Sequence, residues 1–164
     1  MAMIPTMLFS FCSLLMASMF AYSASVQLND PDWYFWFPLY AFASMVNLLN
    51  WKISYNIRIR HVANLALLLG IFLFFKILLE ICSSGTTIAG FLSLDLNQRL
   101  VREKTGSGLV VISMILHIKT SSPSPNPKQP KLPRFVEYGM AGLVGFSYGF
   151  PFFFFAILKK EMKL

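Results

Sequence analysis

The polar residues best placed to do chemistry form a short turn, Asn29-Asp30-Pro31-Asp32, between two apolar runs. Carboxylate and amide oxygens suit Ca²⁺ or Mg²⁺, but these ions need about six or more oxygen ligands, and this turn supplies few. Asp30 before Pro31 is also typical of a helix start, with Asp30 as the N-cap and Pro31 at the first helical position. The turn therefore predicts a helix start, and a cation or ligand site stays open.

Basic residues that could pair with this turn follow later in the chain. If the chain crosses a membrane five times, its first and third connections lie on the same side, which would bring Asp30 and Asp32 near basic residues including Lys104. Such a cluster would either stabilise the bundle or bind a polar substrate. Its predicted members are Asn29, Asp30, Asp32, Arg99, Arg102 and Glu103.

Two further charges, Lys76 and Glu80, lie within the third apolar run, four residues apart on one helix face. Ionisable residues in membrane spans are costly and often functional. A lysine that snorkels to the interface beside an interfacial glutamate is the simpler interpretation. His61 and His117 are far apart in sequence, so we expect interfacial positions for them rather than metal binding.

The composition indicates a membrane protein. Of 164 residues, 56% are hydrophobic and 13% are charged, against about 25% charged in a soluble domain. A membrane span needs about 20 apolar residues, and residues 106–118 form a short run. We predict an all-α integral membrane protein, a bundle of about five transmembrane helices in a single domain, with helices near 4–26, 33–50, 62–82, 106–122 and 137–158.

The segments between these runs are less apolar. Five prolines within residues 121–134 predict an extended loop outside the lipid. Residues 91–104 are interpreted as an interfacial helix or a polar loop. The first run is expected to be a retained helix rather than a signal peptide, because no Lys or Arg precedes it.

The net charge of +7 does not predict nucleic-acid binding, because the basic residues lie at the ends of apolar runs, where lipid head groups attract them. Cys12 and Cys82 both lie in apolar runs and offer neither a disulfide framework nor metal-ligand spacing. The expected partners are the lipid bilayer and, in addition, a second copy or another membrane protein.

Glycines mark the last helix at Gly139, Gly142, Gly145 and Gly149. Small residues four apart let helices approach closely, and Gly145 has such neighbours on both sides, Ala141 and Gly149. Gly145 is therefore expected at the closest helix contact. Packing within the bundle and a dimer face are both open.

No phosphate-binding loop, His-Glu-x-x-His or Cys-x-x-Cys motif occurs. We therefore expect no catalytic residues, no cofactor and no metal. The expected function is a non-catalytic, multi-pass membrane protein that is structural or interacts with lipid or a membrane partner. A small-solute or ion transporter or channel acting as an oligomer is the first alternative. A lipid-modifying membrane enzyme using Asp30, Asp32 and Arg102 is the second.

Three sequence elements resemble a known family. Residues 26–32, Val-Gln-Leu-Asn-Asp-Pro-Asp, are similar to the signature of the transmembrane protein 220 family. Arg102-Glu103 ahead of residues 108–112, Gly-Leu-Val-Val-Ile, resembles the element before that family's fourth helix. The spacing between the two parts is about two residues longer here than in vertebrate members of the family. Residues 160–162, Lys-Glu-Met, match the end of its last helix. The resemblance implies a small multi-pass membrane protein and carries over no catalytic residue.

Overall fold

The computed structural model describes residues 5–52, 57–83, 99–120 and 132–161. Within these ranges the chain is all-helical, with five helices and no strand, so the all-α class is confirmed. The helices are α1 (Met7–Gln27), α2 (Trp33–Lys52), α3 (Ile57–Ser83), α5 (Arg99–Thr120) and α6 (Arg134–Glu161).

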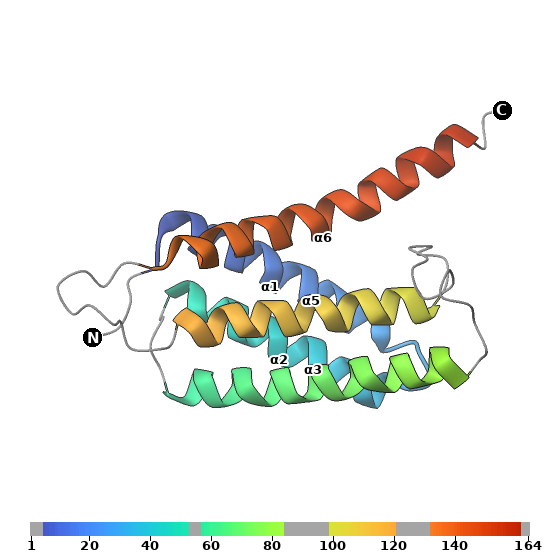
Figure 1. Cartoon of the computed structure of the whole chain (residues 1–164), viewed down its shortest axis with the longest axis horizontal. Coiled ribbons are helices and arrows are strands. Elements are labelled where there is room, and N and C mark those ends of the chain that lie inside the picture. Colours follow the sequence, from blue (N-terminus) through green and yellow to red (C-terminus); the bar gives the residue numbers. More distant parts are fainter. Residues whose placement is uncertain (1–4, 53–56, 84–98, 121–131, 162–164) are drawn as a thin grey trace.

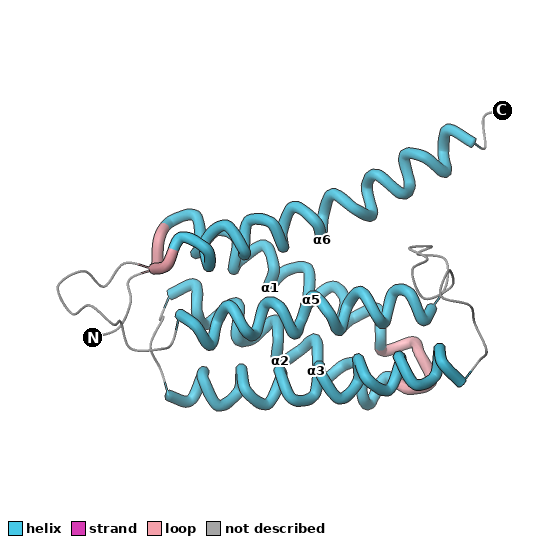
Figure 2. The backbone as a smooth tube through the Cα atoms, in the orientation of Figure 1, coloured by secondary structure: helices cyan, strands magenta, loops and turns pink. Residues whose placement is uncertain are grey.

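Successive helices run in opposite directions along one common axis (Figure 1). α1 packs mainly on α2 and α3 mainly on α5, while α2 also contacts both α3 and α5. The last helix, α6, contacts α1 and α5, and its second half continues beyond the bundle (Figures 1 and 2). α1 begins and α6 ends at opposite ends of the molecule (Figure 1).

The beginning of α1 follows from local chemistry, whereas that of α2 differs from the prediction. Thr6 is the N-cap of α1, and its hydroxyl oxygen accepts a hydrogen bond from the Phe9 amide at 3.3 Å. α2 begins at Trp33, so Asp30 and Pro31 belong to the turn and Asp32 directly precedes the helix. The prediction that Asp30 caps α2 with Pro31 as its first residue is wrong.

The fourth described helix begins earlier than its apolar run predicted. α5 begins at Arg99 rather than Gly106, so its 22 residues span about 33 Å. Residues 99–104 contain Arg, Leu, Glu and Lys, which are strong helix formers, and the side chains of Val101 and Glu103 are buried. Of the predicted interfacial segment, residues 91–98 lie outside the described ranges, as do residues 121–131 of the proline-rich loop.

The core is built from large side chains of every helix. Fully buried ones include Phe9, Trp36, Leu73, Met114 and Met140. The outward face of α3 is also apolar. More than half of each of these side chains is exposed: Leu65, Leu68, Phe72, Phe75 and Leu79.

Two helical stretches, Met7–Gln27 and Arg58–Glu80, are long and apolar enough to cross a membrane. The second carries the exposed apolar stripe of α3. Soluble monomers rarely expose large contiguous apolar patches. The length, the composition and the exposed stripe of α3 therefore all indicate a helix that can cross a membrane.

Candidate functional site

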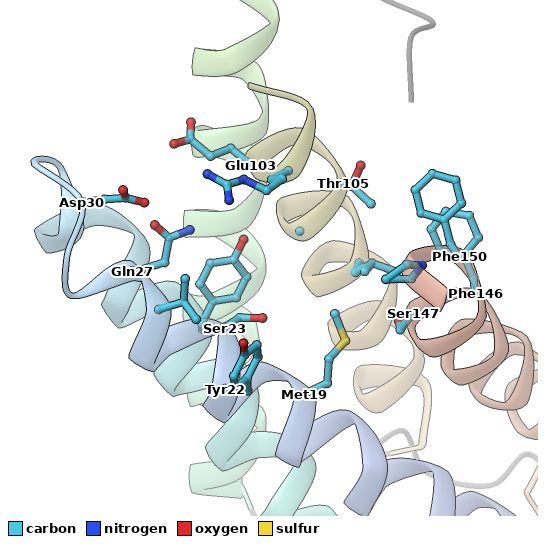
Figure 3. A pocket seen from close by; sticks show the side chains of 16 residues that line it. Met19, Tyr22, Ser23, Gln27, Asp30, Glu103, Thr105, Phe146, Ser147 and Phe150 are labelled. Atoms are coloured by element: carbon cyan, nitrogen blue, oxygen red, sulfur yellow. The ribbon is translucent and has the colours of Figure 1, made fainter. Parts of the chain in front are cut away.

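A pocket of about 510 Å³ lies among α1, α5 and α6, at the end of the bundle where α1 ends and α5 begins (Figure 3). Its volume falls within the range of about 300–1,000 Å³ that is usual for small-molecule sites. The lining residues are Met19, Tyr22, Ser23, Val26, Gln27, Asp30, Tyr40, Arg102, Glu103, Thr105, Gly106, Leu109, Phe146, Ser147, Phe150 and Pro151.

One end of the pocket is polar. Gln27 is the last residue of α1, and Asp30 lies in the following turn, where its amide donates to the Gln27 carbonyl oxygen at 3.0 Å. Arg102 and Glu103 come from the first turns of α5. Asp30, Gln27 and Glu103 gather at one end of the view in Figure 3. The pocket therefore combines two carboxylates, one guanidinium and one amide.

The opposite wall is apolar. Met19 of α1 and Leu109 of α5 face two aromatic rings of α6, Phe146 and Phe150, which stack on each other with centroids 5.3 Å apart. α6 is held against α1 at this level, because the Tyr148 hydroxyl donates to the Leu15 carbonyl oxygen at 2.9 Å. The pocket thus changes from charged to apolar along its length.

The pocket wall also includes a tight contact between α2 and α5. Tyr40 is 3% exposed and stacks on Phe20 and on Trp36, with centroids 6.3 Å and 6.4 Å away. A Cβ atom built at Gly106 would collide with the Tyr40 hydroxyl. Glycine is therefore the residue that fits at position 106, and it lets α5 lie directly against the tyrosine.

The predicted polar cluster is split between two places. Asp30, Arg102 and Glu103 line the pocket, and Asn29 is exposed in the turn. Arg99 begins α5, and its side chain lies outside the described part of the structure.

Asp32 approaches α3 instead. Its Oδ2 lies 3.9 Å from Lys76 Nζ and accepts a hydrogen bond from Trp36 Nε1 at 3.1 Å. Lys76 also lies over the Phe35 ring, 5.4 Å from its centroid. Glu80 is exposed near the end of α3. Lys76 therefore links α3 to the acidic turn before α2.

A second polar group lies buried toward the other end of the bundle. His117 Nε2 and Asn47 Oδ1 are 2.8 Å apart, and Asn50 Nδ2 lies 2.9 Å from His117 Nδ1. Asn47 Nδ2 donates to Ser113 Oγ at 3.1 Å, and Ser13 Oγ donates to the Asn47 carbonyl oxygen at 2.7 Å. This pattern fits a neutral imidazole with its proton on Nε2, and it connects α1, α2 and α5.

The interfacial position predicted for His117 is wrong, because this side chain is fully buried, whereas His61 is exposed. A sequence signal for the network did exist. Asn47 and Asn50 are three apart on one helix, and Ser113 and His117 are four apart on another, so each pair shares a face. Matching polar pairs on two apolar helices indicate a contact between them.

Two buried acceptor atoms accept no hydrogen bond in the described part of the structure: Gln27 Oε1 and Asn50 Oδ1. Gln27 lines the pocket, and Asn50 belongs to the buried network. A buried acceptor without a donor is costly. Gln27 Oε1 is therefore a place where a donor on a ligand in the pocket would be stabilised.

The glycines of α6 play different roles from those predicted. A Cβ atom at Gly139 would lie 3.1 Å from the Leu116 side chain of α5, whereas one at Gly142, Gly145 or Gly149 would meet nothing within 4 Å. The expectation that Gly145 lies at the closest contact within the bundle is wrong, and Gly139 lies there instead.

The two cysteines and the metal-ligating residue types form no site within the described ranges. Cys12 is buried as expected, but Cys82 is exposed near the end of α3, and both are free. Among the described residues, no three His, Cys, Asp or Glu side chains are grouped so that they could hold a metal ion.

Comparison with known proteins connects the site to a family. No curated protein and no solved structure matches the chain. A family model described as "Transmembrane family 220, helix" matches residues 19–119, more than half of the chain. The matched range contains the acidic turn, α2, α3 and nearly all of α5. The chain therefore belongs to transmembrane family 220.

Proposed function

We propose that this chain is a multi-pass integral membrane protein that binds a membrane lipid in the pocket, without catalysing a reaction. The observation that carries the proposal is the order of chemistry along one cavity. Asp30, Arg102 and Glu103 lie at one end, and Met19, Phe146 and Phe150 supply apolar surface. A lipid has the same order, with a polar head and an apolar tail.

The position of the pocket supports this proposal. Its charged end is formed where α1 ends and α5 begins, which in a membrane-spanning bundle is the level of the head groups. Phe150 and Pro151 extend the lining onto the part of α6 that leaves the bundle. A lipid could therefore enter sideways from the bilayer.

Five membrane crossings are part of the proposal. The exposed apolar stripe on α3 and the apolar composition of α1 support two of them directly. α2, α5 and α6 pack alongside these helices in alternating directions (Figure 1). A backbone of helices also satisfies its own hydrogen bonds, as a lipid environment requires.

Small-solute transport is less well supported. Asn47 and Asn50 are engaged in the buried network, Asn64 is exposed, and Lys76 and Glu80 lie towards one end of α3. The polar residues that could line a path across the membrane thus either pack in the buried network or lie toward the outside of the protein. Lipid modification has no specific supporting observation.

Lipid binding can be tested by filling the pocket. Ser23 lines it, whereas Ser25 lies two residues away on the same helix and is exposed. Native mass spectrometry of protein extracted in mild detergent should detect one retained lipid in the wild type and in Ser25→Phe, and its loss in Ser23→Phe. A wild type without bound lipid, or equal retention by both variants, would contradict the proposal.

A further inference from the structure

The charged end of the pocket has an uneven composition. Two carboxylates, Asp30 and Glu103, line it together with one guanidinium, Arg102, and no other charged residue is among the lining side chains of the described chain. Its formal charge is therefore negative by one. A ligand head group that carries a positive charge is favoured there over one that is only negative.

A hydrogen-bond acceptor at the same end specifies the kind of positive charge. Gln27 Oε1 is shielded from solvent and accepts no hydrogen bond in the described structure. Gln27 and Asp30 lie close to each other at the polar end (Figure 3). A primary ammonium can donate to both, because it carries three N–H donors. A trimethylated ammonium has no N–H and would leave the amide oxygen unpaired.

Arg102 provides a site for a negatively charged group beside the ammonium site. It lines the pocket, and its side chain is exposed at the first turns of α5. A guanidinium at such a rim matches phosphate oxygens in a two-pronged geometry. A phosphate beside an ammonium is the pattern of a zwitterionic phospholipid.

We propose that the pocket selects a phospholipid whose head group carries a primary ammonium, with the ammonium at Asp30 and Gln27 and the phosphate at Arg102. This inference rests on the proposed function, because it names the lipid class for the same pocket. The head group fills the charged end. One acyl chain lies along Met19, Leu109 and the two α6 phenylalanines.

The test uses the full-length protein in nanodiscs that contain equal amounts of phosphatidylethanolamine, phosphatidylcholine and phosphatidylglycerol with identical chains. Native mass spectrometry then measures which lipid stays bound when the protein is released. We expect the ethanolamine lipid to exceed the choline lipid about tenfold, since it gains a charge-assisted hydrogen bond. The glycerol lipid, which has no positive charge, should be the weakest.

Substitutions test which residues cause the preference for the ethanolamine lipid over the choline lipid. Asp30→Asn and Gln27→Met should each lower the ethanolamine-to-choline ratio towards one. Arg102→Gln should lower retention of all three lipids and leave that ratio near tenfold, because all three carry a phosphate. Asp32→Asn is the matched control. It removes the same charge two residues away, outside the pocket lining, and should retain the wild-type ratio.

The outcomes separate the two levels of the proposal. A bound lipid with equal ethanolamine and choline retention, or with the glycerol lipid preferred, would overturn the head-group inference and leave lipid binding intact. An unchanged ratio in both Asp30→Asn and Gln27→Met would also overturn it. A wild type that retains none of the three lipids would refute lipid binding itself.

Discussion

A methyl group at Gly106 would fall on the hydroxyl of Tyr40, whereas one at Gly108 would meet only Phe74 at 3.9 Å. Gly106→Ala should therefore destabilise the fold by about 1–3 kcal/mol through overpacking. Gly108→Ala should be neutral or stabilising by up to about 1 kcal/mol, because alanine is the better helix former. Unfolding of the detergent-solubilised protein measures both changes.

A second variant tests the cause. Tyr40→Phe removes the hydroxyl group that occupies the space beside Gly106. The double variant Gly106→Ala, Tyr40→Phe should recover part of the stability that Gly106→Ala loses. Strict additivity of the two changes would mean that the contact between α2 and α5 is not the source of the effect.

The buried network predicts a measurable coupling between Asn47 and His117. Their side chains are 2.8 Å apart and nearly fully buried, so His117→Ala should destabilise by about 1–3 kcal/mol by leaving acceptors and donors unpaired. A double-mutant cycle should give a coupling of about 1 kcal/mol, the size typical inside membranes. Ser25→Ala, at an exposed position of α1 where the hydroxyl donates to the Tyr22 carbonyl oxygen of the same helix, should change stability by less than about 0.5 kcal/mol. A zero coupling energy would show that the two residues act separately.

At the scale of the helices, the sequence did not predict which glycine of α6 contacts α5. The spacing of small residues four apart pointed to Gly145, but the close contact lies at Gly139, outside that spacing. It could not decide which glycine is used, because the choice depends on how α6 is rotated and where it leaves the bundle. The structure places Gly139 against Leu116 and leaves Gly145 open.

The stability effects should follow this arrangement. Gly139→Ile should lower the unfolding temperature in detergent, with a cost of about 1–3 kcal/mol, because a branched side chain must displace Leu116. Gly145→Ile should leave the monomer as stable as the wild type. If Gly145→Ile destabilises the monomer more, then α6 packs in a different rotation. Size-exclusion chromatography of the same variant reports whether Gly145 serves a contact between copies.

The start of α5 shows a second limit at the element scale. The apolar run begins at Gly106, and a run with glycines at its start predicts a helix boundary there. Tertiary contacts override that signal. Val101 and Glu103 are buried ahead of it, and the close fit of Gly106 against Tyr40 gives the glycine a packing role inside the helix.

At the scale of the whole molecule, part of the predicted charge cluster could be inferred from alternating helix directions alone. That argument places the turn before α2 and the start of α5 at one end, and Asp30, Arg102 and Glu103 do line one pocket there. It could not separate Asp30 from Asp32. Their directions depend on the geometry of the turn, which brings Asp32 to Lys76 on α3.

The same alternation predicts the topology of the chain. If all five helices cross the membrane, a tag at Met1 and a tag at Leu164 should be accessible from opposite sides after selective permeabilisation. Cys82 supplies an internal marker, because it is exposed and lies near the end of α3. In a Cys12→Ser background, a membrane-impermeant maleimide should label Cys82 from the side of the Leu164 tag, since α3 and α6 run in the same direction (Figure 1). Labelling of Cys82 from the side of the Met1 tag would contradict the crossing of α1, α2 and α3, and two termini on one side would mean an even number of crossings.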